Sequence, residues 1–143
     1  MIIRDATIAD MNAIAGLYYQ FWNIPSNVSK MEKLFAKIEN NSAYILLCAE
    51  ADGRVVGSVM GIVCEELYGE CLPFLLVENM IIDSAHRKRG IGKALFAEIE
   101  NRARIKGCRQ VLLVTESERK DAIAFYASIG FHPDANRGYK KKL

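Results

Sequence analysis

Basic residues and glycines are concentrated in one short segment, Arg87-Lys88-Arg89-Gly90-Ile91-Gly92-Lys93. The glycines allow a backbone to approach an anion closely, and the four basic side chains supply counter-charge. Helical spacing begins just after Gly90, so the segment would present the first N–H groups of a helix beside those charges. Helix starts of this kind bind phosphate groups. The segment therefore predicts a site for a phosphate-bearing ligand.

Two common phosphate-binding loops do not match this segment. A P-loop needs Ser or Thr directly after its lysine, to hold a magnesium ion, and this chain has Ala94 there. A dinucleotide-binding fingerprint starting at Gly90 needs a further glycine where Leu95 stands. The pattern that remains is Arg-x-x-Gly-x-Gly from Arg87, followed by an amphipathic helix.

The elements that must position this segment alternate between strands and helices. Apolar runs predict strands at 2–4, 43–49, 55–64, 73–82, 110–115 and 139–143, with an Asp52-Gly53 hairpin turn between the second and the third. Apolar residues at three- and four-residue spacing predict a helix from Met11 that Pro25 ends, and further helices at 27–39, 91–107 and 120–129. The first helix follows a capping box, Thr7-Ile8-Ala9-Asp10. The order β-α-α-β-β-β-α-β-α-β predicts an α/β fold with a mixed sheet.

Composition limits the class of protein. The 143 residues are 51% hydrophobic and 25% charged and contain no Pro/Gly/Ser-rich linker, which predicts a single domain over 1–143. The formal net charge is +2, far from the dense positive charge of a dedicated nucleic-acid binder. The N-terminus does not read as a secretory signal, and no apolar run reaches the ~18 residues of a membrane helix. Four cysteines without C-x-x-C spacing and only two histidines predict buried free thiols in a reducing cytoplasm and no metal site.

Beyond these patterns, four segments together resemble the GNAT superfamily, the acetyl-CoA-dependent N-acetyltransferases. The Arg87-x-x-Gly90-x-Gly92 loop matches the family's coenzyme loop. Ile3-Arg4-Asp5-Ala6-Thr7-Ile8-Ala9-Asp10 resembles its opening strand and helix cap, and Val77-Glu78-Asn79-Met80-Ile81-Ile82 resembles its fourth strand. The segment 122–131, Ala-Ile-Ala-Phe-Tyr-Ala-Ser-Ile-Gly-Phe, resembles its late A-x-x-F-Y-x-x-x-G-F motif. The resemblance spans nearly the whole chain.

The resemblance implies a mixed, mostly antiparallel twisted sheet of about six or seven strands flanked by about four helices. It implies acetyl-CoA as cosubstrate, with the pyrophosphate on the loop's backbone N–H groups and the pantetheine arm along the backbone of the fourth strand. The coenzyme-binding residues are then Met80, Ile81, Ile82, Arg87, Lys88, Arg89, Gly90, Ile91, Gly92, Lys93 and Ala122. Many family members carry Asn three residues before that alanine, where this chain has Arg119. Either Arg119 contacts the coenzyme or the hydrogen bond of the asparagine is absent.

Acyl transfer from a thioester to an amine requires a neutral amine, a polarised carbonyl and a protonated leaving thiolate. An alkylammonium has a pKa near ~10, so a base must take its proton. Glu78, a carboxylate inside an apolar strand next to the loop, is the candidate base; the alternative is that it faces solvent or pairs with a lysine. The resemblance assigns a backbone N–H near Met80 to the thioester oxygen and makes Tyr126 the acid, the alternative being a core aromatic beside Phe125.

The acceptor would be an amine, because aromatic and acidic residues occur where the resemblance places the acceptor side. Phe21 and Trp22 end the first predicted helix, and Glu65, Glu66, Tyr68 and Glu70 precede the fourth predicted strand. Such a set would attract a cation, either a small cationic metabolite or an amine of a peptide. The alternative is a solvated charged loop and a core Trp22.

The same residues allow two rival functions. A protein of the same fold could bind acyl-CoA as a regulator without turnover. The basic residues at 87–93 and 140–142 could instead bind nucleic acid, which would predict affinity that falls steeply with salt. We expect neither a nucleic-acid nor a membrane partner. The resemblance is compatible with a homodimer, which no residue pattern specifies.

Overall fold

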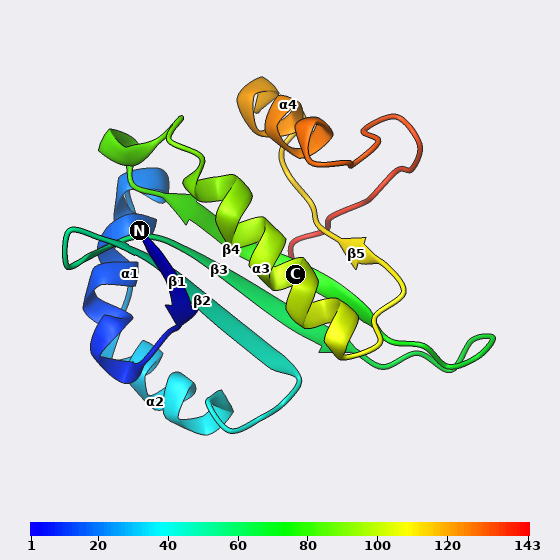
Figure 1. Cartoon of the computed structure of the whole chain (residues 1–143), viewed down its shortest axis with the longest axis horizontal. Helices are drawn as coiled ribbons and strands as arrows, with labels where there is room; N and C mark the ends of the chain where they lie inside the picture. Colours follow the sequence, from blue (N-terminus) through cyan, green and yellow to red (C-terminus); the bar gives the residue numbers. More distant parts are fainter. The chain divides into compact units, whose positions relative to one another are not determined.

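The computed structural model describes residues 1–143. They form two compact units, Met1–Leu112 and Leu113–Leu143, which we call the sheet unit and the C-terminal unit (Figure 1). The sheet unit contains five strands and three α-helices, and the C-terminal unit contains one further helix, α4 (Lys120–Ser128). A single domain over 1–143 stays a prediction.

The sheet follows the order of the chain, β1-β2-β3-β4-β5. Its strands are β1 (Ile2–Asp5), β2 (Tyr44–Ala51), β3 (Arg54–Cys64), β4 (Phe74–Ile82) and β5 (Val111–Leu112). The pairs β1–β2, β2–β3 and β3–β4 are antiparallel, and β5 runs parallel to β4. The predicted mixed, mostly antiparallel sheet is confirmed. The hairpin between β2 and β3 turns at Asp52 and Gly53, both with positive φ, as the Asp-Gly pair predicts.

The expected count of six or seven strands is wrong, and the reason lies at the C-terminal end. The segment 139–143, Tyr-Lys-Lys-Lys-Leu, forms no strand. Its three consecutive lysines repel one another and favour solvent over a strand partner. The predicted strand 110–115 pairs with β4 only at Val111 and Leu112. The observed order therefore lacks the last strand of the prediction.

Helices cover both faces of the sheet. α1 (Met11–Trp22) and α2 (Val28–Ile38) pack a core of Met11, Ile14, Phe35 and Cys48 on one face. α3 (Ile91–Ile105) packs on the other face, where β3 has no side chain at Gly57 and Gly61. A Cβ at Gly61 would lie 2.9 Å from Ile99 Cδ1, so α3 approaches this strand closely because the residue is glycine. We call the two surfaces of the sheet the α1 face and the α3 face.

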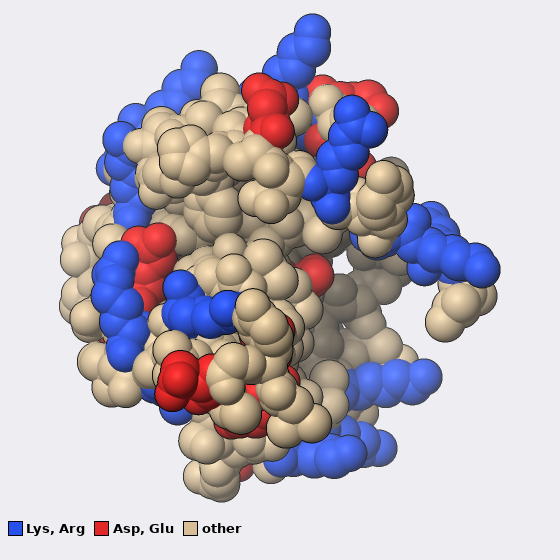
Figure 2. Space-filling model, turned by 90° about the vertical axis from the view of Figure 1, so that its right-hand side faces the viewer, with Lys and Arg blue, Asp and Glu red and all other residues tan.

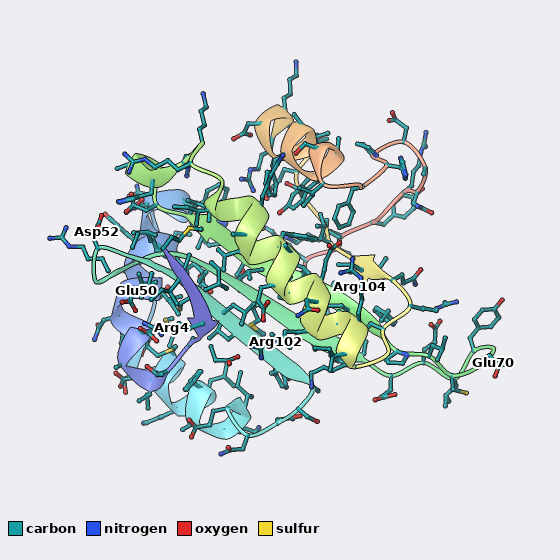
Figure 3. All side chains as sticks on the ribbon, viewed as in Figure 1. Arg4, Glu50, Asp52, Glu70, Arg102 and Arg104 are labelled. Atoms are coloured by element: carbon teal, nitrogen blue, oxygen red, sulfur yellow. The ribbon has the colours of Figure 1, made fainter.

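An ion network joins β1, β2 and the start of the first helical segment. Arg4 donates to both carboxylate oxygens of Asp10, at 2.8 and 2.9 Å, and to Glu50 at 2.9 Å (Figure 3). The Thr7 N–H and hydroxyl also donate to Asp10, and Thr7 with Asp10 forms the predicted capping box. These bonds, the Arg4 bonds first, hold the pKa of Asp10 at about 2. The largely buried carboxylate is therefore charged and fixes the entry into the helix.

The end of α1 and the cysteines bear on two smaller expectations. Helix α1 ends with Phe21 and Trp22, as expected, but the stop is Asn23 rather than Pro25: Asn23 adopts a left-handed cap with φ of 52°, and its N–H bonds Tyr19 O at 2.9 Å. All four cysteines are free thiols, but only Cys48 is buried, and Cys71 is exposed in the loop between β3 and β4. Burial raises the pKa of the Cys48 thiol to about 12. No helix of the structure is both long enough and apolar enough to cross a membrane.

Candidate active site

The basic loop, Arg87–Lys93, joins β4 to α3 and has the backbone of an anion-binding turn. Lys88 and Gly90 both have positive φ, 60° and 80°, and the helix begins directly after Gly90. Its first backbone bond runs from the Ala94 N–H to Gly90 O at 3.0 Å, so the amides before Ala94 have no partner within the helix. No side chain caps this end. The N–H groups and the positive end of the helix dipole are thus available to an anion.

The charges of this loop are also available. Arg87, Lys88, Arg89 and Lys93 are exposed and none forms an ion pair, whereas Arg4, Arg102, Arg104 and Arg109 all do. Arg87 makes one bond within the protein, from Nε to Ile82 O at 3.3 Å. On the face shown in Figure 2, Lys and Arg side chains extend separately from the surface, with acidic groups between several of them. Unpaired cations next to free N–H groups fit a phosphate-bearing ligand.

Asp83 anchors the start of this turn. Its carboxylate accepts the Ala85 N–H at 2.8 Å and Gln20 Nε2 at 3.0 Å, and it contacts His86 Nδ1 at 3.1 Å. The Gln20 bond and then the His86 bond are the largest causes that hold the pKa of Asp83 at about 2. Gln20 Oε1 accepts the Ser84 N–H in return. The loop is therefore tied to α1 through a glutamine that sequence reasoning missed.

Strand β4 carries a bulge directly before the loop. Ser58 of β3 pairs with Ile81, but Met60 pairs with Glu78, so β4 has one residue more than β3 over this stretch. The extra residue lies at Asn79, which has a positive φ of 52°. Bulges re-aim side chains and interrupt the regular ladder. Asn is one of the few residues besides glycine that tolerate a positive φ, so the asparagine at this position is the one sign of the bulge in the sequence.

The bulge divides the predicted residues of β4 between the two faces. Glu78 lies on the α1 face and is exposed, and Ile81 lies on the same face and is buried. Ile82 lies on the α3 face, where its Cδ1 atom would be 2.7 Å from a Cβ at Gly57. Met80 is half-buried. Glu78 therefore faces solvent from the strand, which is the alternative to the base role that the sequence leaves open, and it forms no ion pair with a lysine.

The C-terminal unit holds the remaining predicted residues. The Tyr126 ring contacts Phe125 and Phe131 edge to face, with centroid distances of 5.3 and 5.7 Å. The Tyr126 carbonyl accepts the Phe131 N–H at 3.1 Å, which closes the turn after α4. Arg119 is the N-cap of α4, and Ala122 lies in its first turn. The aromatic motif thus forms one cluster within this unit.

The predicted acceptor residues do not gather at a single place in the structure. Phe21 and Trp22 end α1, on the helix whose Gln20 bonds the Ile82 end of β4. Glu65 and Tyr68 belong to the β3–β4 loop, at the Phe74 end of the same strand; Glu70 marks this loop in Figure 3. A nine-residue strand separates the two ends by roughly 25–30 Å. The loop also has its own cation, since Arg109 bonds Glu66 at 2.9 Å and lies 5.4 Å from the Tyr68 ring centroid.

An open groove of about 500 Å³ lies along α1 and the β2–β3 hairpin and reaches Asp83, at the start of the turn that leads to the basic loop. Its charged residues are Arg4, Asp10, Glu50, Arg54 and Asp83. All but Arg54 already bond to one another or to Gln20, so the exposed Arg54 is the one free charge that the groove offers to a ligand. The structure also contains no cluster of three or more His, Cys, Asp or Glu that could hold a metal ion.

The loop and the strand before it combine an anion-binding turn with an exposed carboxylate. The first can hold a phosphate-bearing group, and the second can accept a proton from a neighbouring ammonium. This pairing is suited to a reaction between a phosphate-tagged donor and an amine.

Comparisons with known proteins agree with this arrangement. The family model described as "Acetyltransferase (GNAT) family" matches residues 11–131. The chain is 28% identical over 131 residues to an aminoglycoside N(6')-acetyltransferase type 1 of Stenotrophomonas maltophilia, covering 90% of this chain and 84% of the relative. It is 30% identical over 86 residues to a glucosamine 6-phosphate N-acetyltransferase of Trypanosoma brucei brucei, covering 60% of this chain and only 56% of that relative's length. A solved structure, a putative acetyltransferase from Agrobacterium tumefaciens, superposes with a TM-score of 0.91 at 21% identity, over 100% of each chain.

Proposed function

The chain belongs to the GNAT acetyltransferase family, and we propose that it transfers an acetyl group from acetyl-CoA to the primary amine of a small cationic metabolite. In this reaction the thioester C–S bond breaks and a C–N bond forms. The attacking ammonium must first lose a proton, and the leaving thiolate must gain one. Acetyl-CoA supplies the activated acetyl group, and the residues of this chain bind it, orient it and move these protons.

The basic loop is the observation that carries this proposal. Its N–H groups before Ala94 and its unpaired cations fit a pyrophosphate, which bears two adjacent negative charges. A Cβ at Gly90 would meet no atom within 4 Å, so the space on that side of the turn is open to a ligand. Arg87, Lys88, Arg89 and Lys93 add charge, and the amides of Ile91, Gly92 and Lys93 donate the bonds.

The fourth strand supplies the polar groups next to the reacting atoms. Glu78 takes the proton from the acceptor ammonium, directly or through a water molecule; its place on the strand directly before the basic loop supports this role. Backbone N–H groups at the bulge beside Asn79 polarise the thioester carbonyl, and those of Ile81 and Ile82 follow the pantetheine arm.

Tyr126 protonates the leaving thiolate, because a phenol is neutral at pH 7 and can donate. Arg119 and Ala122 at the start of α4 contact the coenzyme.

The acceptor is proposed from chemistry rather than from an assembled pocket. Relatives are named for amino sugars, a glucosamine 6-phosphate and an aminoglycoside, and both are primary amines with many hydroxyl groups. Phe21 and Trp22 would contact such a molecule through their rings. Glu65 and Tyr68 would contact only a longer acceptor that extends along β4, such as a peptide. A peptide amine is therefore the alternative acceptor.

The test is release of free thiol from acetyl-CoA with a panel of amines: glucosamine 6-phosphate, an aminoglycoside, spermidine and a peptide with a free N-terminus. We expect release above the amine-free background with at least one amine, and an N-acetylated product of matching mass. The control is the Gly90→Glu variant, in which the coenzyme should bind about 100-fold more weakly. Tight binding of CoA without release for any amine would instead identify a regulator that binds acyl-CoA.

A further inference from the structure

One buried hydroxyl in the sheet unit has no hydrogen-bond partner. Ser58, in the middle of β3, is fully buried, and its Oγ atom has no hydrogen-bond partner of acceptable geometry in the protein. An unsatisfied buried hydroxyl costs about 1–3 kcal/mol, so most proteins provide a partner or use the group for function. This serine lies beside the bulge of β4, and a role for it in binding the acceptor rests on the acetyl transfer proposed above.

The strand register places Ser58 next to the proposed base. Ser58 pairs with Ile81, and Met60, two residues further along β3, pairs with Glu78. Residues that pair across a ladder, and residues two apart on one strand, point to the same face. Ser58 and Glu78 therefore share the α1 face as diagonal neighbours, roughly 7–8 Å apart.

Tyr18 of α1 covers this part of the face. It packs against the core cluster that contains Cys48, the residue paired with Ser58 on β2. Burial raises the pKa of the Tyr18 phenol, and the Ser58 hydroxyl opposes part of that rise, which indicates that the two hydroxyls are neighbours. No hydrogen bond of acceptable geometry joins them. Tyr18 is only half-buried, and its ring contacts Trp22 edge to face at 5.5 Å.

We propose that the Tyr18 hydroxyl binds a neutral oxygen of the acceptor and thereby positions the amine beside Glu78. Ser58 acts through Tyr18 as a positioning residue, because its proton can be donated to the phenol oxygen. When Ser58 donates there, the phenol O–H remains to donate outward to the acceptor. The unsatisfied hydroxyl is then explained by a network that is complete only with substrate.

The environment of Tyr18 selects the chemistry of the acceptor. Two neutral hydroxyls among aromatic and aliphatic side chains favour a neutral oxygen, since burying a second charge there would cost more than it returns. With Ser58 and Glu78 roughly 7–8 Å apart, the oxygen must lie a few bonds from the reacting nitrogen. Amino sugars and other amino alcohols meet this condition, and an unbranched polyamine such as spermidine does not.

The experiment compares one pair of amines in three variants. The pair is trans-2-aminocyclohexanol and cyclohexylamine, which differ by one hydroxyl next to the amine. The variants are Tyr18→Phe, Ser58→Ala and, as a matched control, Tyr19→Phe, whose ring is exposed on the neighbouring position of the same helix. Thiol release gives kcat/KM for each amine and KM for acetyl-CoA, and urea unfolding gives stability.

We expect Tyr18→Phe to lower kcat/KM for the amino alcohol by about 5–10-fold, the effect of one hydrogen bond, and to leave cyclohexylamine and the KM for acetyl-CoA unchanged. Ser58→Ala should cause a smaller loss, about 3-fold, for the amino alcohol alone, without loss of stability because a hydroxyl with no partner is removed. Tyr19→Phe should change neither amine.

Four results separate the alternatives. Equal losses for both amines in Tyr18→Phe, or a loss of stability in Ser58→Ala with unchanged kinetics, assign these residues to packing and overturn the inference. Turnover by the wild type with unchanged discrimination in Tyr18→Phe overturns this inference alone. Absence of thiol release by the wild type with every amine overturns the proposed function, and this inference with it.

Discussion

Substitution of Gly90 by glutamate tests the basic loop directly. Gly90 has φ of 80°, and a Cβ there would enter open space. The glutamate therefore fits without a clash but places a carboxylate where the pyrophosphate is proposed to bind. Two unit charges about 6 Å away at an effective dielectric of about 20, reduced roughly by half by physiological salt, give a repulsion of about 3 kcal/mol. We expect CoA to bind about 100-fold more weakly.

Gly107 offers a matched control at the other end of the same helix. Its φ is 77°, and a Cβ there also meets no atom within 4 Å. Gly107→Glu therefore imposes the same backbone strain, about 1 kcal/mol, and the same change of charge, far from the loop. Calorimetric titration with CoA and urea unfolding should be run on both variants.

The comparison isolates binding from stability. The Gly90→Glu variant should unfold at a urea concentration no lower than Gly107→Glu does, because a carboxylate is favourable at a helix start and unfavourable at a helix end. Only Gly90→Glu should lose CoA affinity. Equal CoA affinities in the two variants would refute the assignment of the pyrophosphate to this loop.

Three further substitutions test other parts of the molecule. Tyr126→Phe should lower kcat by about 100-fold while CoA affinity changes little, since it removes a proton donor and keeps the ring. Thiol release measures kcat and calorimetric titration measures CoA affinity, with Tyr139→Phe as the exposed control. An unchanged kcat would reject the acid role. Because the pKa of Asp10 is lowered from 3.8 to about 2, its charge contributes about 2 kcal/mol to the free energy of unfolding; this contribution is present above pH 4 and is lost as the pH falls toward 2. Measured by urea unfolding between pH 2 and 7, the free energy of unfolding should decline less steeply toward low pH in Asp10→Asn than in the wild type or in the exposed Asp52→Asn. Parallel declines would contradict a stabilising charge at Asp10. Gly61→Ala should destabilise the protein by about 1–2 kcal/mol through contact with Ile99 and Leu75. Gly16→Ala, on the open side of α1, should instead stabilise it by about 0.5–1 kcal/mol. A thermal midpoint that rises in both variants would contradict the close approach of α3.

Local patterns in the sequence predicted most of the sheet unit. The spacing of Met11, Ile14 and Leu17, the Asp52-Gly53 turn and the Gly90 start of α3 are short-range signals, and the structure contains each of them. The tie between Gln20 and Asp83 is different in kind. It joins residues 63 positions apart, and neither residue shows in its own neighbourhood that the other will be near.

The bulge at Asn79 and the position of the β3–β4 loop could not be predicted from the sequence for the same reason. A bulge is a mismatch between two strands, so it depends on how Ser58 and Met60 pair and not on β4 alone. Glu66 was predicted to attract a cationic substrate, and it does bind a cation, but that cation is Arg109 of the same chain. Charge patterns predict the sign of a partner well, and its identity only after the fold is known.

The α1 face of β4 bears on whether the protein is an enzyme or a binder of acyl-CoA. A regulator needs the basic loop, but it has no use for an unsatisfied buried hydroxyl beside a bulge on the adjoining strand. Glu78 and Ser58 are diagonal neighbours there, and the unmet hydrogen bond of Ser58 costs stability in the absence of a ligand. A polar group kept at such a cost is best explained by a second substrate that completes its bonds. The Tyr18→Phe comparison thus separates catalysis from regulation, since only an enzyme with an acceptor on this face should discriminate between the two amines.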